Sequence, residues 1–403
     1  MIKRVVIFFI LFSIVICAYV NAQDTAIHSL LKKIAAQQIS NDAFFSDGNF
    51  PSYISPRQKF STRKKDDNIF FTSLIIYTLK DVQPLLAKED QAIVDSIIIL
   101  AAPLYNKFEN RSGRNTYNFW RTDIKQKFPY GRLLQLLHED LSLPDDMDDT
   151  VLALLALNAD SAAAAELHNL MQHFVNRDST KVRSVIGDYE NQPAYSTWFG
   201  KRFPVVFDVS VLCNVLSFVQ QYQFAFTKAD SASLNVIIQT IENDYHISQP
   251  IYASPYYGKT SLILYHIARL MSISKIPQLE ALKQKLISDA VTAFQQSDNP
   301  LEKMILSSAI IKWGSLPPSF NLQSAYEAEE IHHNNFTLVI GNIRTYQANV
   351  NRKLNTGSDI EVLYDNREAY NDARLLEYLL MNKKEKEDKK RRKKEKRKED
   401  EKG

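Results

Sequence analysis

The sequence predicts an all-α protein. Glycine is scarce, with 10 residues in 403, well below the average of about 7%. Strand-rich folds need more turn glycines than this. Segments with the length and apolar period of helices also follow one another along most of the chain, and short loops rich in Pro, Asp and Asn separate them.

These segments define the expected helices. They cover residues 26–40, 69–86, 90–108, 131–139, 149–157, 161–175, 209–226, 231–245, 255–273, 278–295 and 301–313, with a last helix near 370–380. The exception is the β-branched stretch 336–346, which predicts a short β-hairpin near the C-terminus.

Many helices of similar length joined by short loops are typical of packed antiparallel hairpins. Because no coiled-coil heptad is present, we expect the hairpins to close into a ring. The predicted fold is therefore a single α/α toroid over residues 23–382, in which the inner helices are buried on all sides.

The N-terminus has the pattern of a secretory signal. Lys3 and Arg4 precede an apolar stretch over residues 5–20, and small residues before Gln23 offer a cleavage site. Residues 1–22 are therefore predicted to be a signal peptide, and the protein is expected in a bacterial periplasm or at the cell surface. The alternative is an uncleaved N-terminal anchor.

Cysteine usage is consistent with export without disulfides. Cys17 lies within the expected signal, so Cys213 would be alone in the mature chain and no intramolecular disulfide can form. A core of this size needs no disulfide for stability.

The charge of the chain is concentrated at its ends. Residues 383–403 contain 13 basic and 7 acidic residues, a balance of +6, whereas the part between residues 22 and 383 carries −5. This tail has no apolar residue to bury, so it is predicted to be a solvated segment that is disordered or a fraying helix; the alternative is that it contacts an anionic surface. Specific nucleic-acid binding is not expected.

The residues most suggestive of chemistry are the four aspartates of Pro144-Asp145-Asp146-Met147-Asp148-Asp149-Thr150. They lead into the apolar run 151–157, which is typical of a buried helix. One or two aspartates suffice to cap a helix. Four crowded carboxylates exceed that need, and their repulsion raises the pKa of at least one of them.

The five residues Asp146-Met147-Asp148-Asp149-Thr150 resemble the D-x-D-D-T acid motif of class II terpene cyclases, which are built from α/α toroids. The resemblance implies that Asp148 is a general acid for an alkene or epoxide, supported by Asp146 and Asp149. Such chemistry needs a protonated carboxyl in a low-dielectric pocket with aromatic walls. Trp120, Tyr195 and Trp198 are candidate wall residues by type.

Other interpretations of the same residues remain open. Asp145-Asp146-x-x-Asp149 is an aspartate-rich pattern that suits Mg²⁺, although no second metal motif accompanies it. A glycan-processing enzyme would use a carboxylate of the cluster with Asp208 as its partner. A binding or scaffold protein would use the cluster only as a helix cap.

Polar residues on the apolar helices give narrower expectations. Asp208 is interpreted first as the N-cap of helix 209–226, and Asn214 within that helix must find partners if it is buried. His266 is expected to be a core histidine with its hydrogen bonds satisfied. The expected ligand of the whole protein is an apolar small molecule or a glycan, and no cofactor is predicted.

Overall fold

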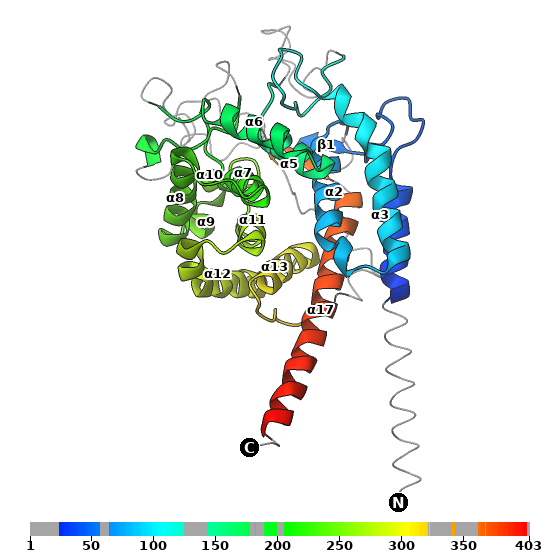
Figure 1. The fold of residues 1–403 in the computed structure, drawn as a ribbon, viewed down its shortest axis with the longest axis vertical. Helices are drawn as coiled ribbons and strands as arrows, with labels where there is room; N and C mark the ends of the chain where they lie inside the picture. Colours follow the sequence, from blue (N-terminus) through cyan, green and yellow to red (C-terminus); the bar gives the residue numbers. More distant parts are fainter. Residues whose placement is uncertain are drawn as a thin grey trace, which may run out of the picture.

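The computed structural model describes residues 24–56, 64–124, 143–177, 182, 189–199, 205–320, 322, 340–342, 362–366 and 368–400. This part of the chain is mostly helical and carries one small antiparallel sheet (Figure 1). The prediction of a predominantly helical protein is confirmed. The predicted helix 131–139 and the predicted signal peptide lie outside the described residues.

The helices follow the predicted segments closely. After a first helix over 24–36 they are α2 (Phe70–Val82), α3 (Lys88–Ala101), α5 (Met147–Leu157), α6 (Ser161–Met171), α7 (Val209–Gln221), α8 (Lys228–Glu242), α9 (Tyr245–Ser248), α10 (Pro250–Ala253), α11 (Thr260–Ile273), α12 (Pro277–Gln296), α13 (Pro300–Lys312) and α17 (Glu368–Asp400). Short 3₁₀ helices cover Gln83–Leu85, Ala102–Lys107 and Tyr189–Asn191.

Side-chain caps explain several of the boundaries. Asp208 accepts hydrogen bonds from the backbone N–H groups of Ser210 and Val211 at the start of α7, so its interpretation as an N-cap is confirmed. Thr227 and Asp230 form a reciprocal capping box at the start of α8.

Six helices pack against one another in a cycle. In order, α2 contacts α5, α5 contacts α7, α7 contacts α11, α11 contacts α13, α13 contacts α17, and α17 contacts α2 (Figure 1). Helices α3, α8 and α12 each pack against members of this set from another side. The cycle brings α2, from the N-terminal part of the chain, against the last helix, α17.

The difference between these two sets of helices follows from their sequences. In α5 all residues from Met147 to Ala156 are buried, whereas the longer α12 buries only Leu279, Leu286, Ala290 and Phe294. A helix that is apolar all round has neighbours on every side, and a helix with one apolar stripe covers a core from outside.

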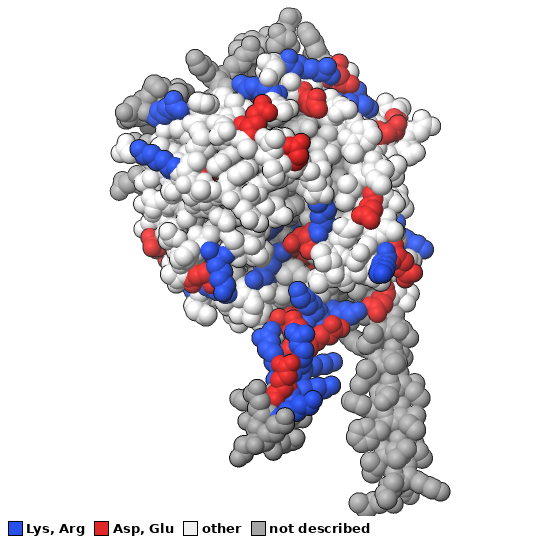
Figure 2. All heavy atoms as spheres, viewed as in Figure 1, with Lys and Arg blue, Asp and Glu red and all other residues white. Residues whose placement is uncertain are grey.

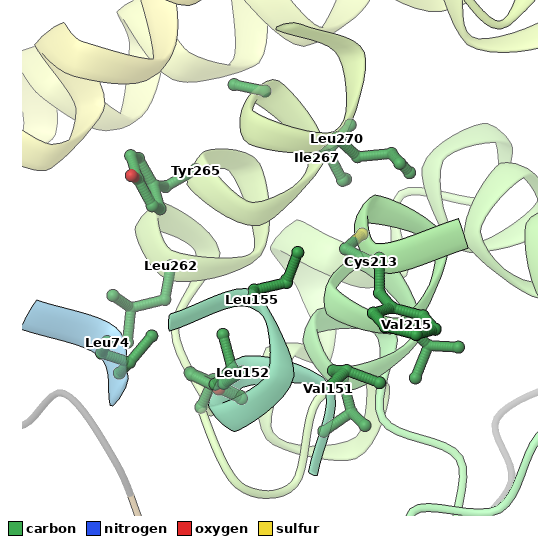
Figure 3. Close-up of a cluster of buried hydrophobic side chains, with 14 of the residues drawn as sticks. Leu74, Val151, Leu152, Leu155, Cys213, Val215, Leu262, Tyr265, Ile267 and Leu270 are labelled. Atoms are coloured by element: carbon green, nitrogen blue, oxygen red, sulfur yellow. The ribbon is translucent and has the colours of Figure 1, made fainter. Parts of the chain in front are cut away.

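Leucine, isoleucine and valine side chains from α2, α5, α7 and α11 meet in one buried cluster (Figure 3). Leu74, Leu152 and Leu262 come from three of these helices and are nearly inaccessible to solvent. Burying each such side chain contributes about 1.5–3 kcal/mol. Replacing Leu152 with alanine would cost about 2–5 kcal/mol, because its neighbours cannot fully close the space.

The sheet corrects the prediction of a C-terminal hairpin. Its strands β1 (Tyr53–Pro56), β2 (Lys64–Lys65), β3 (Ile340–Asn342) and β4 (Val362–Asn366) lie in the order β2-β1-β4-β3, and all pairings are antiparallel. Of the stretch 336–346, only 340–342 is described as a strand. Its partner β4 comes about twenty residues later. The other edge of β4 pairs with β1, which lies in the N-terminal part of the chain.

Of the two forms predicted for the tail, disordered or helical, the structure has the helix. Helix α17 begins in the core with buried Tyr370, Arg374 and Glu377, and it continues without interruption to Asp400. The expected boundary at residue 382 therefore falls inside a helix. A core-anchored first half supplies the helix nucleus that an isolated charged peptide lacks. Among the described residues, no helix has the length and apolar character needed to cross a membrane.

Candidate functional site

The aspartate segment is held between two extended segments of the chain. Asp145 forms a β-bridge with Asn118, and Asp146 forms one with Trp198. The backbone N–H of Met147 donates to Thr197 at 2.8 Å, immediately before α5 begins. All four aspartates are buried, with at most 6% of each residue exposed. The cluster is therefore part of the interior rather than a solvated cap.

Asp145 is used in an ion pair. Arg114 donates from Nε to Oδ2 at 2.9 Å and from Nη2 to Oδ1, and the Thr116 hydroxyl donates to Oδ2 at 2.5 Å. This two-pronged contact occupies both carboxylate oxygens. Asp145 therefore attaches the loop at residues 110–122 to the start of α5.

Asp146 and Asp149 act as a pair. The Oδ1 atom of Asp146 accepts the backbone N–H of Asp149 at 2.8 Å, which makes Asp146 the N-cap of α5. Burial raises the pKa of Asp146 to about 7. Burial and the adjacent charge of Asp146 raise the pKa of Asp149 well above its ordinary value. Two buried carboxyls in contact hold a proton between them near neutral pH.

Asp148 has different surroundings. Its Oδ1 accepts the amide of Asn214 at 2.6 Å, and its Oδ2 accepts the hydroxyl of Tyr257 at 2.6 Å. Both partners donate to the carboxyl group, and burial raises the pKa of Asp148. Burial also raises the pKa of Tyr257 well above 10, so its hydroxyl stays neutral and remains a donor.

A buried cation lies behind this carboxyl. Arg269 on α11 donates from Nη2 to Oδ1 of Asn214, and its guanidinium lies 4.9 Å from the ring centre of Tyr77 and 5.7 Å from that of Tyr265. Within the described part of the chain it forms no ion pair with a carboxylate. Its charge therefore acts on Asp148 through one intervening amide.

Aromatic rings surround the Tyr257 hydroxyl. The Tyr257 ring lies 6.2 Å from Phe70 and 4.4 Å from His266, measured between ring centres. The Nδ1 of His266 bonds to the carbonyl of Leu262 at 2.7 Å, while its Nε2 has no hydrogen-bond partner among the described residues. Burial lowers the pKa of His266 well below 6.5, so the ring is neutral. His266 is a core histidine as expected, but with one nitrogen unsatisfied.

Two of the predicted wall residues contact other parts of the structure. The indole N–H of Trp120 donates to Asp66 at 2.7 Å. The hydroxyl of Tyr195 donates to Asp230 at 2.8 Å and accepts from Gln172. Their polar groups therefore serve separate hydrogen-bond networks.

The other two predicted residues lie closer to the cluster. Trp198 is bridged to Asp146 through its backbone, and its indole N–H donates to the Tyr256 hydroxyl at 2.9 Å. Asp208 accepts from the Ser254 hydroxyl at 2.5 Å and from the Tyr256 N–H at 2.8 Å. Asp208 thus ties the loop that carries Tyr257 to the start of α7.

Three contributors to this site were not predicted from the sequence: Arg114, Tyr257 and Arg269. Arg269 left a recognisable signal, because an arginine in an otherwise apolar helix must find compensation when it is buried. Tyr257 stands in an aromatic loop immediately before such a helix. Arg114 left none, since its partner lies 31 positions away.

The cluster does not suit the Mg²⁺ interpretation. A metal over Asp145-Asp146-x-x-Asp149 would compete with Arg114 for both oxygens of Asp145. Among the described residues, Asp244, His246 and Asp289 have the proximity of metal ligands. However, the ammonium of Lys285 already pairs with the carboxylates of Asp244 and Asp289 and offsets part of their charge.

One cavity in the described part of the chain lies apart from the aspartates. It has a volume of about 370 Å³ and lies between the end of α7, α8 and the start of α12. Phe226, Leu234 and Ile276 form its apolar wall, and Asn235 and Lys275 are among its polar residues. None of the contacts described above for Asp148 involves these residues.

Comparison of the chain with protein-family models, with curated proteins and with solved structures found no match.

Proposed function

We propose that the cycle of six helices is the inner ring of an α/α toroid. The closed order of contacts from α2 through α17 and back supports this arrangement, as do α3, α8 and α12 packed on those helices from another side. A closed ring places the N-terminal ends and loops of several inner helices together at one mouth. Asp148, Asn214 and the loop before α11 meet in this way.

We further propose that the protein is an exported general-acid enzyme that acts through Asp148 on an apolar, electron-rich substrate such as an alkene or epoxide. The observation that carries this proposal is the pair of donors held against the buried carboxyl of Asp148. Asn214 and Tyr257 both donate to the carboxyl. When Asp148 is protonated, its O–H can turn toward the Tyr257 hydroxyl, which then accepts it, or donate to a substrate.

The same contacts favour release of the proton. Burial raises the pKa of Asp148 and so favours its protonated form, because an ionised carboxylate is poorly solvated there. Once the proton leaves, the Asn214 amide and the Tyr257 hydroxyl hold the new carboxylate, and the positive charge of Arg269 lies behind Asn214. Donors fixed before the reaction stabilise the charge that develops during it. A cation formed on the substrate would face the rings of Tyr257 and Phe70.

The test is turnover of isoprenoid alkenes and epoxides by the wild type and by Asp148→Asn. The substitution keeps the side-chain size and removes the acidic proton. The control is Asp160→Asn at the exposed N-cap of α6, which changes the same group elsewhere. We expect Asp148→Asn to remain folded and to lose at least about 100-fold in rate. Equal turnover by both variants would remove Asp148 from the chemistry.

The structure gives less support to the glycan-processing alternative. A glycosidase needs a second carboxyl free to act as base or nucleophile. Asp208 accepts hydrogen bonds from two N–H groups of α7, from Ser254 and from Tyr256, so it is engaged as a structural cap. A binding or scaffold role remains the alternative, and folded protein without turnover of any substrate would favour it.

The proposal of export rests on the N-terminal sequence. Lys3 and Arg4 ahead of the apolar residues 5–20 fit a signal peptide cleaved before Gln23. Sequencing the N-terminus of protein recovered from the producing cells tests it. A mature chain that begins at Gln23 in the exported fraction is expected, and an intact chain found only in the cytoplasm would contradict export.

A further inference from the structure

The cavity between the end of α7, α8 and the start of α12 has the size of a small-molecule site. Its volume is about 370 Å³, and ligand sites in proteins occupy about 300–1,000 Å³. Figure 1 shows α8 and α12 side by side, on the side of the molecule away from α3. Neither Asn214 nor Tyr257, the partners of Asp148, lines this space. We call it the α8 cavity; a ligand there would have contacts separate from those of the aspartate cluster.

One wall of the α8 cavity is apolar. Leu234 and Ile238 lie four positions apart, so they are neighbours on one face of α8. Phe226, which precedes α8, and Ile276, which precedes α12, extend this wall. Each CH₂ group that is fully buried against such a wall contributes about fourfold to affinity. A hydrocarbon chain is therefore the kind of group that this wall would hold.

Two polar side chains of the α8 cavity have no partner within the described part of the chain. Asn235 lies on the same face of α8 as the apolar residues and is half-buried, yet its side-chain amide forms no hydrogen bond there. Lys275, in the short connection between α11 and α12, is exposed and forms no ion pair there. Amide and ammonium N–H groups are donors, so both side chains are able to hold an acceptor placed beside the apolar wall.

The charge of the α8 cavity is positive. Among the described residues that line it, Lys275 is charged and none is an aspartate or a glutamate. Figure 2 shows that charged side chains gather on α17, whereas the face of the body turned to the viewer is mostly uncharged. One cation matches the single negative charge of a carboxylate. A phosphate monoester carries about −1.5 to −2 and is better matched by several cationic groups.

We propose that the α8 cavity binds a small monocarboxylate with an apolar chain, such as a medium-chain fatty acid. The carboxylate would accept hydrogen bonds from Lys275 and Asn235, and the chain would lie against the apolar wall. A neutral apolar molecule would leave both donors without an acceptor, and a cationic ligand would be repelled by Lys275. This site does not depend on the reaction proposed for Asp148, because none of its lining residues contacts that carboxyl.

The test is isothermal titration calorimetry of the full-length protein with hexanoate, octanoate and octylamine. Octanoate is expected to bind about 5–15-fold more tightly than hexanoate, because two further CH₂ groups reach the apolar wall. Octanoate is also expected to bind about 25-fold more tightly than octylamine, because an exposed ion pair contributes up to about fivefold and octylamine replaces this attraction with a similar repulsion. Equal binding of octanoate and octylamine would overturn the proposal.

The ratio of the octanoate affinity to the octylamine affinity isolates the charge, because a loss of folded protein lowers both affinities alike. Lys275→Gln is expected to reduce this ratio from about 25 to about 1. The matched control is Lys283→Gln on α12, because Lys283 pairs with Glu280 at 3.7 Å and does not line the cavity. Its ratio is expected to stay within about twofold of the wild-type ratio. Equal reductions in the two variants would contradict the role of Lys275, since net charge alone would then explain the preference.

The apolar wall is tested by Ile238→Asn, which is expected to weaken octanoate binding about tenfold. Its control is Ile247→Asn, because Ile247 is 44% exposed and does not line the cavity. If Ile238→Asn bound octanoate as tightly as the wild type does, the chain of the ligand would lie elsewhere and the proposal would be wrong. Circular dichroism of each variant verifies that the helices persist.

Discussion

Raising the pH is expected to destabilise this fold through Asp208. Its side chain is fully buried, and burial raises its pKa to about 7 from the ordinary 3.8. The folded protein therefore holds this proton more tightly than the unfolded chain does. The free-energy cost of ionising this buried carboxyl is absent below about pH 4 and grows until the pH passes about 7. A difference of about three pH units at about 1.4 kcal/mol each gives about 4 kcal/mol.

The substitution that isolates this effect is Asp208→Asn. Asparagine is also a good N-cap, but it cannot ionise. Its Nδ2 would face the N–H of Tyr256, which costs about 1–3 kcal/mol at every pH. The burial of His266 makes stability rise with pH, but this contribution is the same in the wild type and in Asp208→Asn. The stability difference between variant and wild type should thus move by about 4 kcal/mol in favour of the variant between pH 4 and pH 8.

Urea unfolding followed by circular dichroism across this pH range measures the difference, provided that the denaturant slope stays constant. Asp160→Asn is the control, because that cap is exposed and its carboxylate keeps its water. A difference between wild type and Asp208→Asn that changes by less than about 1 kcal/mol would refute the reasoning. It would mean that the donors around Asp208 fully compensate the loss of solvent.

Three further predictions concern single positions. Gly48→Ala should cost at least about 3 kcal/mol in urea unfolding, since φ is +83° and a Cβ would lie 2.3 Å from a backbone carbonyl oxygen of α3. Gly113→Ala, at φ +85° with open space, should cost only about 1–2 kcal/mol, and equal losses would contradict the steric argument. Arg114→Gln should cost about 3–5 kcal/mol by leaving Asp145 buried without its cation, and the double variant with Asp145→Asn should recover part of this loss. Tyr257→Phe should slow turnover by about 10–100-fold, because Asp148 loses a donor that stabilises its conjugate base, and an unchanged rate would argue against that role.

Helix positions were predictable because each depends on a local pattern. The apolar periods of residues 209–226 and 278–295 are local patterns, as are Asp208 before the first and Pro277 at the start of the second, and α7 and α12 form there. The sheet was not predictable, since β1 and β4 are separated by about 300 positions and no local signal selects that pairing. The continuation of α17 past residue 382 was predicted only as one of two alternatives. Composition describes the charged segment, but the buried half of α17 lies outside that window.

The candidate site shows the same division. The density of carboxylates around Asp148 could be read directly, as could the cap at Asp208. The partners Asn214 and Tyr257 lie 66 and 109 positions from Asp148 and come together only when α5, α7 and α11 pack. The aromatic residues Trp120 and Tyr195 were chosen by type, and type does not determine direction. Their polar atoms satisfy Asp66 and Asp230 instead.

The excess of acid ahead of α5 now has a physical account, because the carboxyls have different partners. Asp145 neutralises Arg114, and Asp146 caps the helix while sharing a proton with Asp149. Asp148 accepts hydrogen bonds from two neutral donors, and the buried guanidinium of Arg269 lies on the far side of one of them, Asn214. If all four served as caps, three would be unpaired buried charges, which a stable core does not tolerate. In the proposed mechanism Asp148 is the carboxyl that transfers its proton, while the contacts of its neighbours hold the segment in place.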